Sequence, residues 1–346
     1  MFGLQVNSFK FKNFIVQHIG KETIFKPFIK FMQGASFVMD YLLFYKFKLI
    51  RNKSSITEIN IEFVSYCNLR CKLCSLDHEK TKIRMSADIL KRFFENFLSD
   101  NRFRSVKTIH LYNAGEVLLH PKLMEMLDIV KQFKEKAKKK NIFFPQIALL
   151  TNATILDETK SKLLINSNVI DNIRFSMDGG SKEKFEEMRT RAEWDVFIKN
   201  IKTFCELNKN SAKPIPTGII TLVEYHNKLN TKWMSDEFKE LLNMVDGYEL
   251  RYAHNWGGDV EIEELKNKSK TKYKVGCSLL MHQLVLLPNG DITVCCADLN
   301  SKGVIGNINK EDLFSIYNKP LRLEMLQKFM NNKKHEIDLC KDCETF

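Results

Sequence analysis

The chain lacks any long uninterrupted hydrophobic run. The longest apolar stretch near its start, Ala35–Tyr45, is interrupted by Asp40 and is shorter than the roughly 20 residues that a membrane-spanning helix needs. The start also lacks a compact apolar block followed by small residues, the pattern of a secretory signal. Internal repeats and low-complexity segments are absent as well. We therefore expect a cytoplasmic globular protein without a transmembrane span.

The chain is long enough for more than one folded part. Its 346 residues, 44% of them hydrophobic, suit one large α/β domain with a smaller companion. The net charge of +12 is unevenly spread, because residues 1–55 hold nine Lys or Arg against only Glu22 and Asp40. No recognised nucleic-acid module accompanies this charge, so no nucleic-acid partner is expected.

The basic segment 1–55 also carries ten of the 26 phenylalanines. Interleaved Phe, Ile, Leu and Lys favour amphipathic helices, which can pack on the edge of a folded domain or lie on an anionic membrane surface. We favour packing. Contact with the membrane surface stays open as the second interpretation, and with it a peripheral location.

From residue 56 onward, strand-like and helix-like stretches alternate. Helical patterns, such as the one that Ser86 can cap, lie between short apolar strands. Six such βα units predict a parallel sheet curled into a partial (β/α)6 TIM-like barrel, with functional groups at the carboxyl ends of its strands. The strand candidates are 56–66, 106–113, 143–152, 172–178, 216–226 and 248–254. A helix is expected to start at Pro121 and to run through Val130 into a Lys-rich end, and further helices are expected near 157–166, 182–208 and 231–245.

The alternation of strand-like and helix-like stretches ends near residue 260. A charged stretch, 266–274, reads as a linker, and the Asn289-Gly290 pair between two apolar runs predicts a hairpin. A helix at 311–330 and a terminal cysteine pair follow. We expect three parts: an extension over 1–55, a partial barrel over 56–260 and a small C-terminal domain over 261–346.

Nine cysteines are many for a chain without an export signal, and clustered cysteines in a reducing compartment favour metal binding. Cys205 stands alone and is interpreted as a buried structural thiol. Cys67, Cys71 and Cys74 form a C-x3-C-x2-C loop after the first strand. Three thiolates can hold a four-iron cluster with one iron open to a ligand. A zinc site completed by a fourth ligand such as His78 is the alternative.

The segment Cys67–Cys74, Cys-Asn-Leu-Arg-Cys-Lys-Leu-Cys, resembles the signature of the radical S-adenosylmethionine (SAM) superfamily. In that family the open iron of a [4Fe–4S] cluster binds SAM. An injected electron then yields a 5′-deoxyadenosyl radical, which abstracts hydrogen from a substrate. Leu73 replaces the aromatic residue that commonly precedes the third cysteine.

Three further stretches resemble family motifs, each at the end of an expected strand. Ala114-Gly115-Glu116 resembles the Gly-Gly-Glu motif that holds the SAM amino group, and Thr151-Asn152-Ala153 resembles Thr-Asn-Gly. Ser176-Met177-Asp178-Gly179 resembles the Ser-x-Asp-Gly stretch, in which Ser176 would contact the ribose or carboxylate of SAM. The resemblance therefore implies SAM contacts by Gly115, Glu116, Asn152, Ser176 and Asp178.

The C-terminal cysteines resemble the SPASM type of extension found on many radical SAM enzymes. A full SPASM domain carries two auxiliary clusters, and this chain has too few cysteines for two. The resemblance implies one auxiliary [4Fe–4S] cluster, with Cys296 as an alternative to Cys295 and a structural zinc knuckle as the other possibility. The expected ligands are Cys277, Cys295, Cys340 and Cys343.

The resemblance implies a radical SAM oxidoreductase reduced by a flavodoxin or ferredoxin. We expect a two-electron oxidation or rearrangement of a carbohydrate-like or other small molecule, with peptide modification as the second hypothesis. A non-catalytic iron–sulfur carrier or a zinc-stabilised protein is the third. The general base stays unassigned, although Arg251, His254 and Cys296 lie near expected strand or cluster ends.

Overall fold

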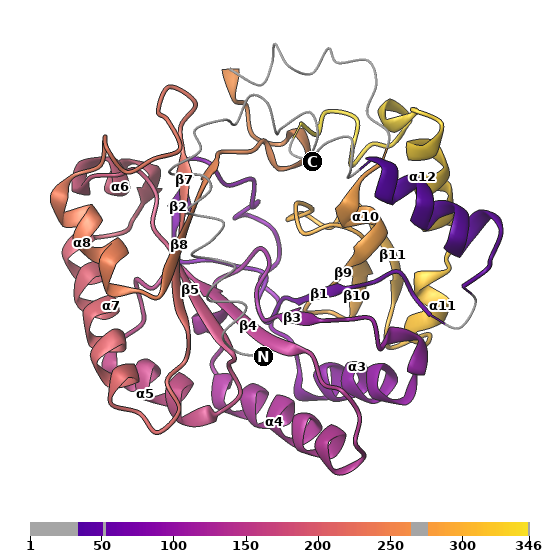
Figure 1. The fold of residues 1–346 in the computed structure, drawn as a ribbon, viewed down its shortest axis with the longest axis horizontal. Helices are drawn as coiled ribbons and strands as arrows, with labels where there is room; N and C mark the ends of the chain where they lie inside the picture. The colour runs from indigo at the N-terminus through magenta and orange to yellow at the C-terminus, as the bar shows by residue number, and fades with distance from the viewer. Residues whose placement is uncertain (1–33, 51–52, 264–275, 345–346) are drawn as a thin grey trace. The chain divides into compact units, whose positions relative to one another are not determined.

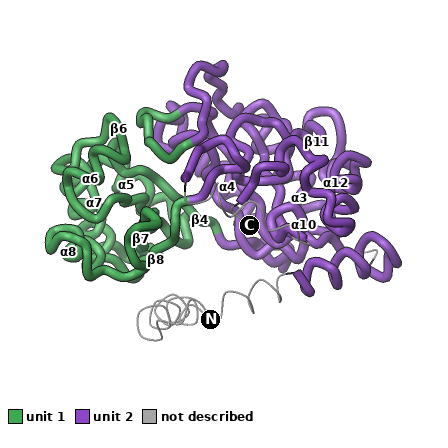
Figure 2. The backbone as a smooth tube through the Cα atoms, turned by 90° about the horizontal axis from the view of Figure 1, so that it is seen from above, with its two compact units in different colours: residues 1–25, 67–74, 147–253 green, residues 26–66, 75–146, 254–346 purple. Residues whose placement is uncertain are grey.

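The computed structural model describes residues 34–50, 53–263 and 276–344. The expected linker 266–274 and most of the N-terminal extension therefore lie outside the described residues. Contacts divide the chain into two compact units (Figure 2). Unit 1 includes Cys67–Cys74 and Ile147–Ala253, and unit 2 includes the segment ending at Tyr66, Ser75–Gln146 and His254–Phe346. This division differs from the expected three parts, whose boundaries stay a prediction.

Unit 1 is built on parallel strands. Ile173 and Phe175 are fully buried and alternate with half-buried Arg174 and Ser176, so one face of the sheet is apolar and the other is mixed. The helices α5 (Glu158–Ser167), α7 (Trp194–Lys209) and α8 (Asp236–Met244) lie along one side of the strands (Figure 1). In spatial order the strands are β4 (Gln146–Thr151), β5 (Asn172–Ser176), β7 (Thr217–Val223) and β8 (Gly247–Tyr252).

A short antiparallel ribbon in unit 1 corrects the expectation of one helix over 182–208. The chain instead forms α6 (Lys182–Met188), the strand β6 (Arg189–Thr190) and then α7. Strand β6 pairs with β2 (Arg70–Cys71), and Cys71 lies opposite Arg189. The helix stops there because residues 189 and 190 exchange backbone hydrogen bonds with the cysteine loop.

In unit 2, β1 (Glu58–Ile61) lies between β3 (Thr108–His110) and β9 (Gln283–Leu286), parallel to both. Two amphipathic helices, α3 (Ala87–Ser99) and α4 (Leu123–Lys139), pack on each other. Ser86 caps α3 by accepting a hydrogen bond from the Ile89 N–H, as expected. The short 3-10 helices η2 (Asn101–Phe103) and η3 (Val117–Leu119) complete this part. With the parallel strands of unit 1, this confirms the expected α/β class.

The expected hairpin forms from β9 and β10 (Asp291–Thr293), and β11 (Val304–Asn307) adds antiparallel to β10. Gly290 adopts φ +89° in the turn, a conformation that glycine permits. The expected helix over 311–330 is divided into α11 (Leu313–Tyr317) and α12 (Pro320–Met330), because Pro320 starts a new helix at its first turn. The remaining short helices are α10 (Ser278–His282), η4 (Trp256–Gly258) and η5 (Lys334–Glu336).

The described part of the N-terminal extension is helical from residue 34 through η1 (Tyr41–Lys46), a π-helix. Phe37 is buried against Phe329 of α12, and the Tyr45 hydroxyl donates to that of Tyr317 over 2.6 Å. These contacts favour packing for this segment. Met39, Phe47 and Leu49 nevertheless remain exposed. Within the described ranges, no helix is both long and apolar enough to span a membrane.

Candidate functional site

The first cysteine loop leaves β1 and is anchored to β6. Lys72 N–H donates to the Met188 carbonyl over 2.8 Å, and Cys74 N–H donates to the Cys71 carbonyl over 3.2 Å. The three thiols of Cys67, Cys71 and Cys74 are half-buried. Burial raises the pKa of Cys71 to about 11, although the nearby Arg189 opposes that shift. A bound metal would displace the thiol protons, since thiolates are the ligands.

Asn152 lies beside the Cys67 sulfur. Its Nδ2 is 3.6 Å from Cys67 Sγ, and the Leu69 N–H donates to the same sulfur over 3.4 Å. The Asn152 Oδ1 accepts from both the N–H and the hydroxyl of Thr154, which orients the amide group. The SAM contact that the resemblance implied for Asn152 stays a prediction, and the structure adds that Asn152 lies within donor distance of the Cys67 sulfur, an expected cluster ligand.

Ala153 stands where the family often has glycine, and it adopts φ +57°. This left-handed conformation costs a residue with a Cβ about 1–2 kcal/mol. It turns the chain directly after β4, so that the neighbouring Asn152 can reach Cys67. Ala153 thus adopts a backbone conformation that glycine would take at lower cost.

Asp178 and Arg189 form a buried ion pair next to the cysteine loop. Arg189 Nη2 is 2.7 Å from Asp178 Oδ2, and Asp178 Oδ1 accepts the Leu222 N–H over 2.8 Å. Burial alone disfavours the charged guanidinium, but Asp178 and the thiols of Cys71 and Cys67 outweigh it and raise the pKa of Arg189. Among the described residues, its Nε has no hydrogen-bond partner. Asp178 thus positions a cation that the sequence did not single out.

Ser176 ends β5, where the sequence placed it. It is half-buried and pairs in register with Ile220 of β7, on the face that it shares with Arg174. Ser176 therefore lies at the carboxyl end of a parallel strand, the position at which α/β folds of this kind place their functional groups.

Gly115 and Glu116 lie in unit 2 at a turn after β3. A Cβ on Gly115 would lie 1.9 Å from the Val64 carbonyl oxygen, so only glycine permits this approach. The Glu116 carboxylate accepts the Leu118 N–H over 3.1 Å and caps η3. One oxygen of the Glu116 carboxylate is thus already hydrogen-bonded to the Leu118 N–H within the protein.

The C-terminal cysteines gather in unit 2. A hydrogen bond with Cys296 and burial raise the pKa of Cys295, burial raises that of Cys340, and the charge of nearby Cys277 contributes in the same direction to both. Cys343 N–H donates to the Cys340 carbonyl over 3.1 Å in a tight loop. That loop is fastened by Asn255, whose Nδ2 donates to the Asp342 carbonyl over 2.8 Å. Four thiols of the expected set are thereby brought into one neighbourhood.

The side chains of Cys295 and Cys296 hydrogen-bond to each other but differ in their other neighbours. The Cys296 N–H donates to Gln283 Oε1 over 2.9 Å, and its charged neighbours are Cys295 and Glu58 rather than Cys277 or Cys340. Cys295 instead interacts with Cys277, and its sulfur accepts the Ala297 N–H over 3.3 Å. This geometry favours Cys295 as the ligand of the two.

The thiols of the two cysteine sets suit iron–sulfur clusters, whose irons are held by cysteine thiolates. A cluster of several irons spreads its thiolates around a larger body than a single ion, and N–H donors to sulfur, as at Cys67 and Cys295, are typical of such sites.

The residues noted as possible bases each have neighbours within their own unit. Arg251, on β8, pairs with Glu249 at 3.3 Å, and the His254 ring packs 4.1 Å from that of Trp256. His254 belongs to unit 2 and Arg251 to unit 1. The general base stays unassigned.

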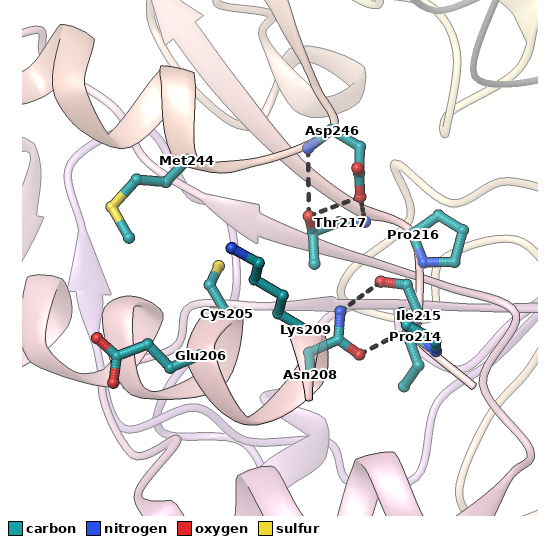
Figure 3. A pocket seen from close by; sticks show the side chains of 10 residues that line it. All are labelled: Cys205, Glu206, Asn208, Lys209, Pro214, Ile215, Pro216, Thr217, Met244 and Asp246. Carbon is teal, nitrogen blue, oxygen red and sulfur yellow. Dashed lines mark hydrogen bonds between the residues drawn. The ribbon is translucent and has the colours of Figure 1, made fainter. Parts of the chain in front are cut away.

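A pocket of about 570 Å³ opens at the amino ends of β7 and β8 (Figure 3). There, Thr217 and Asp246 bond to each other, and Cys205 lies at the wall. Burial raises the pKa of Cys205 to about 11, so this half-buried thiol stays protonated at neutral pH. The structural role expected for Cys205 is consistent with this setting, which lies at the opposite ends of β7 and β8 from the carboxyl-end positions.

Two family models match the chain. The radical SAM superfamily model matches residues 61–228, and the SPASM iron–sulfur cluster-binding domain model matches residues 277–344. The first includes Cys67, Cys71 and Cys74, and the second includes all the C-terminal cysteines.

Curated relatives match more distantly. The subtilosin biosynthesis protein AlbA of Bacillus subtilis is 24% identical over 285 residues, which cover 75% of this chain and 59% of AlbA. A cofactor-modifying protein for the tungsten-containing aldehyde ferredoxin oxidoreductase of Pyrococcus furiosus is 29% identical over 119 residues, which cover 34% of this chain and 30% of that protein. The chain thus spans less than two thirds of either relative.

The fold resembles that of BtrN, whose crystal structure holds AdoMet and 2-DOIA. The two share 17% sequence identity and a TM-score of 0.56, covering 85% of this chain and 94% of BtrN. A likeness at this identity concerns the fold alone. The two matching family models lead to one conclusion: the chain belongs to the radical SAM superfamily and carries a C-terminal SPASM-type iron–sulfur domain.

Proposed function

We propose that this enzyme oxidises a small molecule, carbohydrate-like or similar, by two electrons. When bound, the SAM-bearing [4Fe–4S] cluster supplies a 5′-deoxyadenosyl radical that removes a hydrogen atom from the substrate, and an auxiliary cluster supplies a one-electron acceptor. Cys67, Cys71 and Cys74 would hold the first, and Cys277, Cys295, Cys340 and Cys343 the second. A flavodoxin or ferredoxin would provide the initiating electron.

The observation that carries this proposal is the pairing of a three-thiol loop with one separate four-thiol set. Three ligands leave one iron open, whereas four ligands close a cluster and suit it to electron transfer. With only one closed cluster, a single electron acceptor accompanies the radical. Loss of one hydrogen atom and one further electron and proton is a two-electron oxidation.

The chain's own residues would orient SAM and stabilise the negative charges of the SAM carboxylate and the Cys67 sulfur. Arg189, held by Asp178 with its Nε unpartnered among the described residues, would neutralise the SAM carboxylate. Gly115 would let backbone carbonyls approach the SAM ammonium, and Ser176 would contact the ribose or carboxylate. Asn152 and the Leu69 N–H would stabilise the charge on the Cys67 sulfur.

Peptide modification is the second candidate. It is supported by the similarity to AlbA, a bacteriocin biosynthesis protein, over three quarters of this chain. The two candidates differ in their substrates, a small molecule or a peptide. Conversion of a precursor peptide in step with stoichiometric SAM cleavage would favour the second.

The direct test is anaerobic reconstitution with iron and sulfide, followed by SAM and a reductant. The protein should release 5′-deoxyadenosine, and Cys71→Ala should not. A Cys205→Ser variant is the matched control, because Cys205 belongs to neither cysteine set. Release by Cys71→Ala at the wild-type rate would refute the assignment of the cluster loop.

A further inference from the structure

Glu62 is a carboxylate buried in unit 2 directly after β1. Glu62 is 2% exposed, and its backbone N–H donates to the Leu286 carbonyl of β9 over 2.9 Å. Burying a carboxylate is costly unless donors compensate it. The side chain therefore needs specific partners in the folded protein.

Those partners belong to the turn that carries the Ala-Gly-Glu motif. Glu62 Oε2 accepts the Ala114 N–H over 3.0 Å and the Asn113 Nδ2–H over 3.1 Å. Both donors come directly before Gly115. One carboxylate oxygen thus fixes the entry to the turn by a backbone and a side-chain bond.

The chain following Glu62 holds the other end of the same turn. Glu116 N–H donates to the Tyr66 carbonyl over 3.0 Å, and Gly115 is packed onto the Val64 carbonyl. The turn is therefore held by hydrogen bonds on both sides of Gly115, at Ala114 and at Glu116. Loss of the Glu62 contacts would free its entry while leaving its exit attached.

The charge of Glu62 is only partly compensated. Burial raises the pKa of Glu62, while the Ala114 and Asn113 donors and the positive charge of Lys80 oppose that shift. Lys80 itself donates to the Leu299 carbonyl over 2.6 Å. The strongest direct bonds to Glu62 are thus those from the turn.

We propose that Glu62 is a positioning residue for SAM, which shapes the turn at Asn113–Glu116 so that its backbone can receive the SAM ammonium. The inference rests on the proposed function, because it takes that turn as the ammonium site. It predicts that Glu62 acts through hydrogen-bond geometry, without touching SAM.

The test measures the dissociation constant of SAM by anaerobic equilibrium dialysis on reconstituted protein, together with the SAM-induced change in the paramagnetic resonance spectrum. Glu62→Ala should weaken SAM binding by roughly 10-fold or more, since a hydrogen bond to a charged group contributes about 1.5–3 kcal/mol. Glu62→Gln keeps an acceptor oxygen at the same place and should stay within about threefold of wild type. Iron content and the spectrum without SAM should not change.

Glu58→Gln is the matched control, because Glu58 begins β1, pairs with His110 rather than with the turn, and is about half exposed. It should bind SAM like wild type. Should Glu62→Ala fail to fold, Asn113→Ala removes one of the same bonds and should weaken SAM binding by roughly threefold to tenfold.

Two results would overturn the inference. One is wild-type SAM affinity in Glu62→Ala, or in Asn113→Ala if the first variant is unfolded. The other is a Glu62→Gln variant as weak as Glu62→Ala, because its acceptor geometry is retained. A wild-type protein that binds no SAM would instead refute the proposed function itself, so the two failures are distinguishable.

Discussion

Arg189 lies directly opposite Cys71 across the β2–β6 ribbon, and its guanidinium is held 2.7 Å from Asp178. The ribbon thereby carries an expected cluster ligand on one strand and a buried cation on the other. A guanidinium at this place can pair with a carboxylate group.

Replacing Arg189 should weaken SAM binding while leaving the cluster intact. Arg189→Gln removes the charge, and a charged hydrogen bond to the SAM carboxylate is worth roughly 10–100-fold in affinity. The SAM dissociation constant measures the loss of binding, and the iron content of the reconstituted protein shows whether the cluster is intact. Arg191→Gln, at an exposed neighbour, should match wild type. Loss of iron together with SAM affinity would show that Arg189 supports the loop rather than SAM.

Replacing Asn152 should make the first cluster harder to reduce. Its Nδ2–H group stabilises negative charge on the Cys67 sulfur, and reduction adds negative charge to the cluster. Asn152→Ala should lower the midpoint potential by roughly 60 mV, equivalent to a tenfold change in a one-electron equilibrium. A redox titration followed by paramagnetic resonance checks this. Asn166→Ala, exposed on α5, should leave the potential unchanged, and an unchanged potential in Asn152→Ala would argue against the contact.

The adjacent cysteines should behave differently. Cys295→Ser should reduce the iron content from about eight to about four per chain, because one of two four-iron clusters loses a ligand. Cys296→Ser should retain both clusters, since its side chain faces Gln283 and Glu58. Iron and sulfide analysis after anaerobic purification is the measurement. The reverse pattern would assign Cys296 as the ligand.

Stability should decline on acidification in part through His120. Burial lowers the pKa of His120, whose Nε2–H donates to the Met85 carbonyl and whose Nδ1 accepts the Lys122 N–H. The unfolded chain therefore binds more protons below the ordinary histidine pKa of about 6.5, and this part of the stability is lost as the pH falls below that value. Urea unfolding between about pH 7.5 and pH 5 should be less pH-dependent in His120→Gln. The exposed His335→Gln should behave like wild type, and equal slopes in all three proteins would contradict the assignment.

Local patterns predicted most of the scaffold. The six strands from β1 to β8 that carry apolar runs, the Asn-Gly hairpin and the Ser86 cap depend on residues close in sequence, so propensity and periodicity indicate them. The three-cysteine loop was visible for the same reason, since its ligands lie within Cys67–Cys74. The four C-terminal cysteines were grouped by a resemblance, and their assignment as ligands stays a prediction.

The features that the sequence did not indicate depend on contacts between residues far apart in the chain. Residues 182–208 read as one helix, and only the pairing of residues 189 and 190 with the cysteine loop divides it and reveals Arg189. Glu62 lies within the expected strand 56–66 and was not singled out by the sequence, because its partners Asn113 and Ala114 come from a turn about 50 residues away in the chain. Asn152 was assigned to SAM by its motif, while its contact with Cys67 depends on a loop 85 residues away.

The central claim is that one iron of the cluster at Cys67, Cys71 and Cys74 is open to SAM. A paramagnetic resonance titration of the reduced protein, with and without SAM, tests it most directly. The account predicts signals from two clusters, of which SAM perturbs one, and that one should disappear in Cys71→Ala. A spectrum that SAM leaves unchanged, or a perturbed signal that survives in Cys71→Ala, would contradict it.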